Sequence, residues 1–175
     1  MMNSPALRSP SIAPDVSTAA RLSQLGIRLP KPWAVTPTTE AAFVRVIGRR
    51  VMVSGHLPID DEGRVCGPFG RIGAEVSEDA GVRAAERAML AIFASLVREI
   101  GSLDRIAGWI QLFGMVCADP SFKAYPKVID GASRLVNQVF GGEVGKHSRI
   151  AVAVAGLPFN APVEVQAELE LLPDA

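Results

Sequence analysis

Two histidines and two cysteines are the residues of this chain most able to bind a metal or act as a nucleophile. His56 and His147 lie far apart, and neither has a second His, Cys or carboxylate at metal-ligand spacing. Cys66 and Cys117 form no CxxC pair, and no Ser or Cys lies in a nucleophile elbow. We therefore expect no metal centre and no covalent hydrolase, and we interpret both cysteines as buried, reduced thiols. His147 is typical of a polar residue at the entrance of a strand.

The segment GGEVGKHS, residues 141–148, contains the Gly-Lys pair of a phosphate-binding loop. A Walker motif also needs a first glycine, separated by four residues from the Gly-Lys pair, and a Ser or Thr directly after the lysine. Phe140 and His147 occupy those two positions, and the segment follows a predicted helix and not a strand. The sequence therefore does not predict a nucleotide site.

Residue type alone does not single out Arg149 or Glu164 from the other charged residues of the chain. A guanidinium can bind a carboxylate through two parallel charge-assisted hydrogen bonds. A carboxylate can hold a water molecule and accept its proton during attack on a carbon. On residue type alone, however, Arg149 is typical of a surface arginine at the start of a strand. Glu164 shares a strand face with Gln166, Glu168 and Glu170, which is typical of a solvent-facing stripe.

The composition indicates one domain without a nucleic acid or membrane partner. The 175 residues are 49% hydrophobic, which is enough for a core, and 18 Lys and Arg balance 18 Asp and Glu. No global field attracts nucleic acid or an anionic membrane. The N-terminus lacks the apolar core of a signal peptide, and no stretch approaches the roughly 18 apolar residues of a membrane span. We therefore expect a cytoplasmic protein.

Hydrophobic periodicity divides the chain into three parts: a disordered tail over 1–17, a short helix and extended connector over 18–40, and a domain over 41–175. Within the domain we predict a hairpin (43–49 and 51–54), a helix (77–100), a strand (106–117), a second helix (121–140, bent near Pro126 and Gly131) and two final strands (149–155 and 163–171). This order favours an α+β fold, with an antiparallel or mixed sheet covered by helices on one face.

Three segments carry a resemblance to a known family. VSGHLP, residues 53–58, is similar to a SGQ-x-P loop, and IGSLDRI, residues 100–106, resembles a G-S/A-L-D-x-V passage. RIAVAVAGLPFNAPVEV, residues 149–165, resembles a signature of Arg, alternating strand, Leu-Pro and Val-Glu-Ile/Val. In their order and spacing the three resemble the RidA/YjgF superfamily of reactive-intermediate deaminases, over roughly residues 42–172. The segments 128–142 and 146–156 look closer to its chorismate-mutase-like branch.

The resemblance implies a chorismate-mutase-like fold, with two long helices packed on one face of a mixed sheet. It also implies a homotrimer with clefts at the subunit interfaces. The implied reaction is hydrolysis of 2-imino or enamine acids, such as 2-aminoacrylate, to 2-keto acids and ammonia, with no cofactor and no metal. The alternative is a non-catalytic homotrimer of the same superfamily, which either binds a small carboxylate-bearing metabolite or acts as a regulatory protein. A ribonuclease is a weaker one, because the neutral charge does not favour RNA binding.

Two catalytic residues follow from this resemblance. Arg149 matches the arginine that binds the substrate carboxylate, and Glu164 matches the glutamate that orients the attacking water. Backbone amides that help bind substrate fall at Gly55 and Ala151. Asp130 falls at the position of a family asparagine.

The identity of the substrate is not predicted, because the role of Ser54 has two readings and several residues differ from the family's pattern. The Ser54 hydroxyl is as able to bond its own loop as to touch substrate. Ala151 replaces a frequent cysteine, His56 replaces the glutamine of the loop, and no residue near 34–37 matches the family's N-terminal tyrosine.

Two expectations concern assembly. If the last two strands form a hairpin about residues 158–161, Arg149 and Glu164 lie six residues apart along it, or roughly 20 Å. One imino acid could not touch both, so we expect each cleft to take them from different subunits. The strand at 149–155 is also apolar on both faces, and helices can cover only one, so we expect a neighbouring subunit to cover the other.

Overall fold

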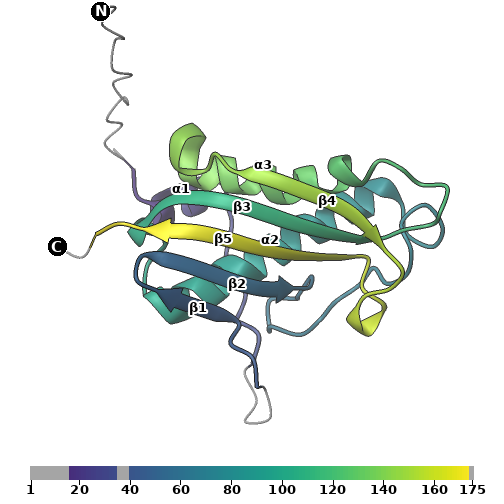
Figure 1. Ribbon diagram of the computed structural model, residues 1–175, viewed down its shortest axis with the longest axis horizontal. Coiled ribbons are helices and arrows are strands. Elements are labelled where there is room, and N and C mark those ends of the chain that lie inside the picture. Colours follow the sequence, from purple (N-terminus) through teal and green to yellow (C-terminus); the bar gives the residue numbers. More distant parts are fainter. Residues whose placement is uncertain (1–15, 35–39, 174–175) are drawn as a thin grey trace, which may run out of the picture.

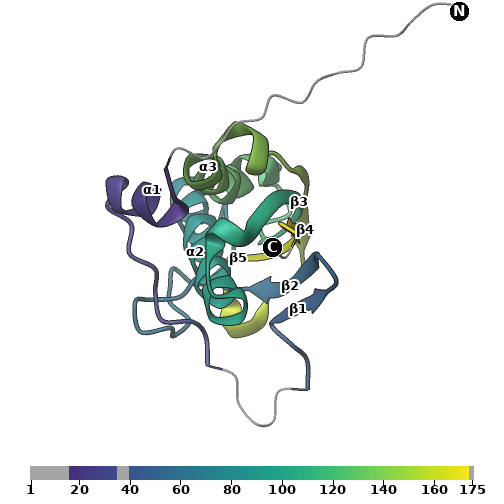
Figure 2. The ribbon, with the colours of Figure 1, turned by 90° about the vertical axis from the view of Figure 1, so that its left-hand side faces the viewer.

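A mixed sheet with two long helices on one of its faces forms the body of the protein, as Figures 1 and 2 show. The computed structural model describes residues 16–34 and 40–173. Its elements are α1 (Thr18–Gln24), β1 (Val44–Ile47), β2 (Arg50–His56), α2 (Glu78–Ile100), β3 (Ile106–Cys117), α3 (Tyr125–Val144), β4 (Ser148–Val154) and β5 (Val163–Leu171), with 3-10 turns at Leu103–Arg105 and Pro158–Asn160. The predicted α+β class is confirmed. Of the predicted tail, residues 1–15 lie outside the described part of the chain.

The strand order is β1-β2-β5-β3-β4, and only β3 and β4 run parallel among the described strands. The expected hairpin between the two final strands is therefore wrong, because β3 lies between them. The helix-facing residues of β5, including Val165 and Leu169, are completely buried. That burial requires a central position beneath the helices, whereas the small Ala151 and Ala153 of β4 fit at an edge.

Capping residues and glycines set the ends of the two long helices. Ser77 caps α2 by accepting a hydrogen bond from the Ala80 amide, and Gly101 ends the helix at φ 81°. The predicted start of the second helix at residue 121 is wrong, since the Ser121 amide donates instead to the Asp119 carboxylate at 2.8 Å. The non-helical residue in α3 is Gly141, and not the predicted Pro126 or Gly131. Pro126 lies in the first turn, where its missing amide costs nothing.

The core lies between the sheet and the pair α2 and α3. Its largest fully buried side chains include Phe93, Ile92, Leu112 and Leu169. Burying each such side chain stabilises the fold by about 1.5–3 kcal/mol. Gly131 allows α3 to approach α2 so closely that a Cβ there would overlap the Val82 carbonyl. The sheet thus packs against a closely packed pair of helices, α2 and α3.

Both cysteines are free thiols. Cys117 is buried at the end of β3, as expected. The expectation that Cys66 is buried is wrong, since it is only half-buried in the loop between β2 and α2.

The opposite face of the sheet, which Figure 1 views, carries no helix of the described chain. Strand alternation places Phe113 and Met115 of β3 on this open face, and Ile150 and Val152 of β4 beside them. The four polar residues of β5 also share it, as predicted (Glu164, Gln166, Glu168 and Glu170). No helix among the described residues is long and apolar enough to cross a membrane.

Candidate functional site

Glu164 is the second residue of β5, with its side chain on the open face, against the backbone of Gly55. Gly55 lies in a bulge of β2, where Val53 pairs with Ala167 but His56 pairs with Val165. A Cβ at Gly55 would overlap the Glu164 carboxylate, so only glycine leaves room for it. Glu164 is half-buried, and this burial raises the pKa of its carboxyl above the usual value. The site thus holds a carboxyl with increased affinity for a proton beside the half-buried backbone of Gly55.

The bulge is held by His56, which is completely buried. Its Nδ1 lies 2.7 Å from the Ser54 carbonyl oxygen and must donate to it, so Nε2 accepts from the Ser95 hydroxyl at 2.8 Å. Burial lowers the His56 pKa to about 4, which keeps the imidazole neutral. The Ser54 hydroxyl donates to the Ala42 carbonyl at 2.8 Å, the local bond that was one of its two expected roles.

Aromatic rings border the same loop. The centroid of Phe43 lies 5.5 Å from that of His56 and 5.7 Å from that of Trp33. Phe159 contacts Trp33 at 6.2 Å and is 66% exposed, at a φ of 58° that is unusual for a bulky residue. The sequence analysis found no match to the family's N-terminal tyrosine near residues 34–37. Residues 35–37 lie outside the described part of the chain. Phe43 supplies an aromatic ring beside the loop that the sequence analysis missed.

Arg149 lies on the other face of the sheet, beside α3. Its Nη1 donates to Asp130 Oδ1 at 2.6 Å and to the Ser133 hydroxyl at 3.2 Å. The structure therefore brings together two of the predicted site residues, Arg149 and Asp130. Ala151 follows two positions later on the same face of the edge strand β4. The guanidinium is about one-quarter exposed and has further N–H groups for a ligand.

Ser133 and His147 extend this cluster and were missed as site residues. His147 Nδ1 donates to the Gly145 carbonyl at 2.6 Å, and Nε2 lies 2.9 Å from the Ser133 hydroxyl. Ser133 follows Asp130 by three positions, so helical spacing could have placed both on one face. Nothing in the sequence shows that the turn after α3 brings His147 back to that face.

Strand register shows how far apart the two clusters are. Arg149 aligns with Leu112 and Ala167, whereas Glu164 aligns with Met115 three residues along. The Cα atoms are thus about 10 Å apart along the strands and about 10 Å apart across them. The predicted separation of six residues is wrong, because it assumed that β4 and β5 pair. The two side chains also project from opposite faces, so one small ligand cannot reach both within a chain.

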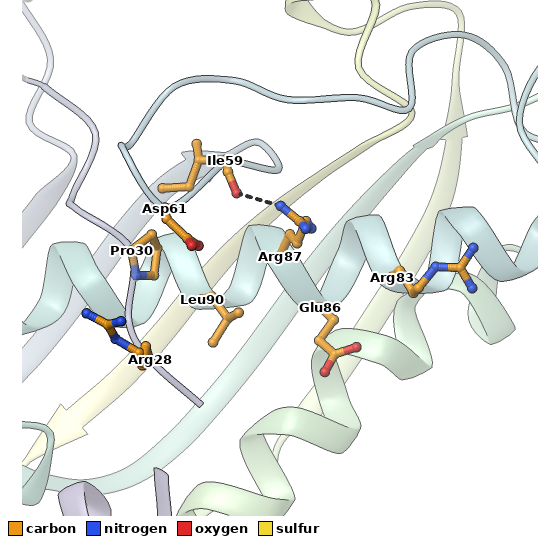
Figure 3. Close-up of a pocket in the computed structure, with 8 residues that line it drawn as sticks. All are labelled: Arg28, Pro30, Ile59, Asp61, Arg83, Glu86, Arg87 and Leu90. Carbon is orange, nitrogen blue, oxygen red and sulfur yellow. Dashed lines mark hydrogen bonds between the residues drawn. The ribbon is translucent and has the colours of Figure 1, made fainter. Parts of the chain in front are cut away.

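A pocket of about 240 Å³ on the outer side of α2 is a weaker candidate (Figure 3). Arg87 points toward the Ile59 carbonyl, while Arg28, Arg83 and Glu86 point away from one another in Figure 3. The charges do not converge on one ligand position. Within 16–34 and 40–173, no group of three or more His, Cys, Asp or Glu residues could hold a metal ion.

Several known proteins are similar to this chain over most of its length. Protein TCP17 of Trypanosoma cruzi is 39% identical over 161 residues, which cover 92% of this chain and 98% of that protein. The protein Atu1372 of Agrobacterium tumefaciens, whose function is unknown, is 35% identical with a TM-score of 0.79, covering 88% of this chain and 92% of its own. A protein of Shewanella oneidensis MR-1 with an endoribonuclease description is 30% identical with a TM-score of 0.82, covering 89% of this chain and 100% of its own.

Residues 19–171 match the family described as "YjgF/chorismate mutase-like, putative endoribonuclease". This match covers both clusters described above, from the β2 bulge to Glu164 and from Asp130 to Ala151. The chain therefore belongs to the YjgF/chorismate mutase-like family, the RidA/YjgF superfamily that its three sequence segments resemble.

Proposed function

We propose that the protein is a cofactor-free hydrolytic deaminase that converts 2-imino and enamine acids to 2-keto acids and ammonia. The observation that best supports this proposal is the Glu164 carboxyl, half-buried and held against the Gly55 backbone with a raised pKa. A carboxylate with increased proton affinity is suited to activate water near neutral pH. Arg149 supplies the matching group for a substrate carboxylate.

In the proposed reaction, an enamine first tautomerises to the imine, whose nitrogen is protonated. Arg149 holds the carboxylate, and water held by Glu164 adds to C2 while Glu164 accepts one of its protons. That proton passes to the amino group, the C–N bond breaks and ammonia leaves. The remaining hydroxyl loses its proton as the C=O bond forms. Each imino acid and one water thus give one 2-keto acid and one ammonium ion, without redox change.

The proposal requires a second subunit at each site. Arg149 and Glu164 project from opposite faces of one chain, so a complete site needs Arg149 from one copy and Glu164 from the next. The apolar part of the open face, on β3 and β4, offers a surface for that contact, with Ile150 40% exposed at the edge strand. We propose a homotrimer with a cleft at each interface. Two free cysteines suit a reducing, cytoplasmic setting.

A non-catalytic metabolite-binding trimer is the second candidate. Asp130 is bonded to the guanidinium of Arg149, and Ala151 places no thiol beside it. Such a site could retain carboxylate binding without turnover. A ribonuclease, the activity in the family's description, has less support because the chain has no net charge.

Ammonia release from 2-aminoacrylate generated in situ separates these candidates. We expect wild type to accelerate the release and Arg149→Ala to lose the acceleration. Arg149→Lys should fail too, because an ammonium cannot reproduce the two parallel bonds of a guanidinium. Binding of 2-oxobutanoate without any acceleration would favour the non-catalytic trimer. Full activity of the lysine variant would contradict the role assigned to Arg149.

A further inference from the structure

The cavity next to Arg149 extends well beyond its guanidinium. It measures about 550 Å³ and is lined by Ser133, Asn137, Gly142, Lys146, His147 and Arg149. Two of these side chains are the cations Lys146 and Arg149, of which Arg149 is paired with Asp130, and none of the lining residues in the described chain is acidic. The cavity therefore offers a second positive charge that a single substrate carboxylate does not use.

Lys146 differs from the other three lysines of the chain because its ammonium has no partner among the residues that the structure describes. Lys31 pairs with Glu62, Lys127 pairs with Glu78, and the Lys123 ammonium donates to the Pro120 carbonyl. Within the described residues, the Lys146 ammonium has neither a hydrogen bond nor an ion pair. This exposed ammonium lines the same cavity as Arg149, the proposed partner of the substrate carboxylate, so it is available to a second anionic group on the ligand.

The spacing of the two cations fits a short ligand. Lys146 and Arg149 are three residues apart, so their Cα atoms lie at most about 10 Å from each other. Both side chains line the same cavity, and His147 between them is fixed by the Gly145 carbonyl and the Ser133 hydroxyl. A ligand with two carboxylates joined by two or three carbons is small enough for this cavity, and the flexible stem of Lys146 can bring its ammonium to the second carboxylate. The Asn137 amide lines the same cavity.

We propose that the preferred substrates are 2-imino dicarboxylic acids, with the C1 carboxylate on Arg149 and the distal carboxylate on Lys146. This inference rests on the proposed deaminase function and specifies its substrate class. The products are then 2-keto dicarboxylic acids and ammonia, formed by the same addition of water at C2.

Product binding tests the inference without turnover. Isothermal titration calorimetry of the full chain compares 2-oxoglutarate, which has two carboxylates, with 2-oxobutanoate, which has one. We expect wild type to bind 2-oxoglutarate about tenfold more tightly, the effect of roughly one charge-assisted hydrogen bond. Lys146→Gln should reduce this ratio to near one, and Lys146→Arg should restore it. Lys123→Gln, which removes the same charge outside the cavity, should keep the wild-type ratio.

Equal affinity of wild type for the two ligands would overturn the inference, and so would a ratio that survives in Lys146→Gln. Unfolding temperatures of all variants establish that each one is folded. If the dicarboxylate preference depends on Lys146 but no imine is hydrolysed, the ligand class stands and the deaminase proposal fails. If 2-aminoacrylate is hydrolysed but no preference exists, the deaminase proposal stands and the ligand class fails.

Discussion

Glu164 lies where burial of its charged carboxylate opposes folding. Its pKa is raised by burial, so the folded state binds its proton more tightly than the unfolded state does. The free energy of unfolding therefore decreases as the pH rises above about 4.5, the ordinary glutamate value. At neutral pH the charged side chain thus opposes folding, and a neutral isostere should not.

We expect Glu164→Gln to unfold at the same urea concentration as wild type at pH 7, or at a higher one, while ammonia release falls at least about a hundredfold. Glu168→Gln on the same strand is the control. Arg50 lowers the pKa of Glu168. Loss of the Glu168 charge should therefore destabilise the fold slightly and leave the activity near that of wild type. Parallel losses of stability and activity in Glu164→Gln would show that this residue is structural.

His56 gives the fold a dependence on pH of the opposite sign. Its folded pKa of about 4 lies below the ordinary value of 6.5, chiefly because of burial, and nearby Arg98 also lowers it. Between these values the unfolded chain binds a proton that the folded chain does not, so stability falls as the pH drops from 6.5 towards 4. A shift of this size corresponds to about 3 kcal/mol. Urea unfolding of wild type and His56→Gln at pH 7.5 and 4.5 measures it, and equal slopes with pH would contradict the assignment.

At the scale of elements, the β2 bulge determines where the Glu164 carboxylate lies. Gly55→Ala should displace the carboxylate, because the added methyl group would occupy its position. We expect a loss of activity of about tenfold or more, since small displacements of catalytic groups are costly. Gly108→Ala in β3 is the matched control, because an added Cβ there meets nothing within 4 Å. Wild-type kinetics in Gly55→Ala would remove the bulge from the account.

The local pattern of the sequence predicts elements better than it predicts their neighbours. The strand at 106–117 and the helix at 77–100 agree with β3 and α2 because apolar spacing and caps are encoded within each segment. The position of β5 between β2 and β3 depends on contacts between segments far apart in the chain, so it could not be read from alternation alone. The motifs drew attention to Arg149 and Glu164, but only the register shows that they face opposite ways.

For the whole molecule, we propose that assembly depends on the apolar part of the open face, which β3 and β4 form. We expect sedimentation at micromolar concentration to give a trimer for wild type. Ile150→Glu places a charge on that face at an edge strand, so it should yield folded monomers with little ammonia release. Circular dichroism serves as the control for folding. A monomeric wild type, or an active monomeric variant, would contradict the need for a second subunit.

Mixing of two inactive variants tests most directly the claim that each site combines Arg149 of one subunit with Glu164 of the next. Arg149→Ala and Glu164→Gln are unfolded together, refolded as a mixture, and assayed for ammonia release from 2-aminoacrylate. With random exchange in a cyclic trimer, about one-quarter of the clefts receive both intact residues, so about one-quarter of wild-type activity should return. Each variant refolded alone should remain inactive. If mass spectrometry confirms mixed trimers and no activity returns, the shared site is contradicted.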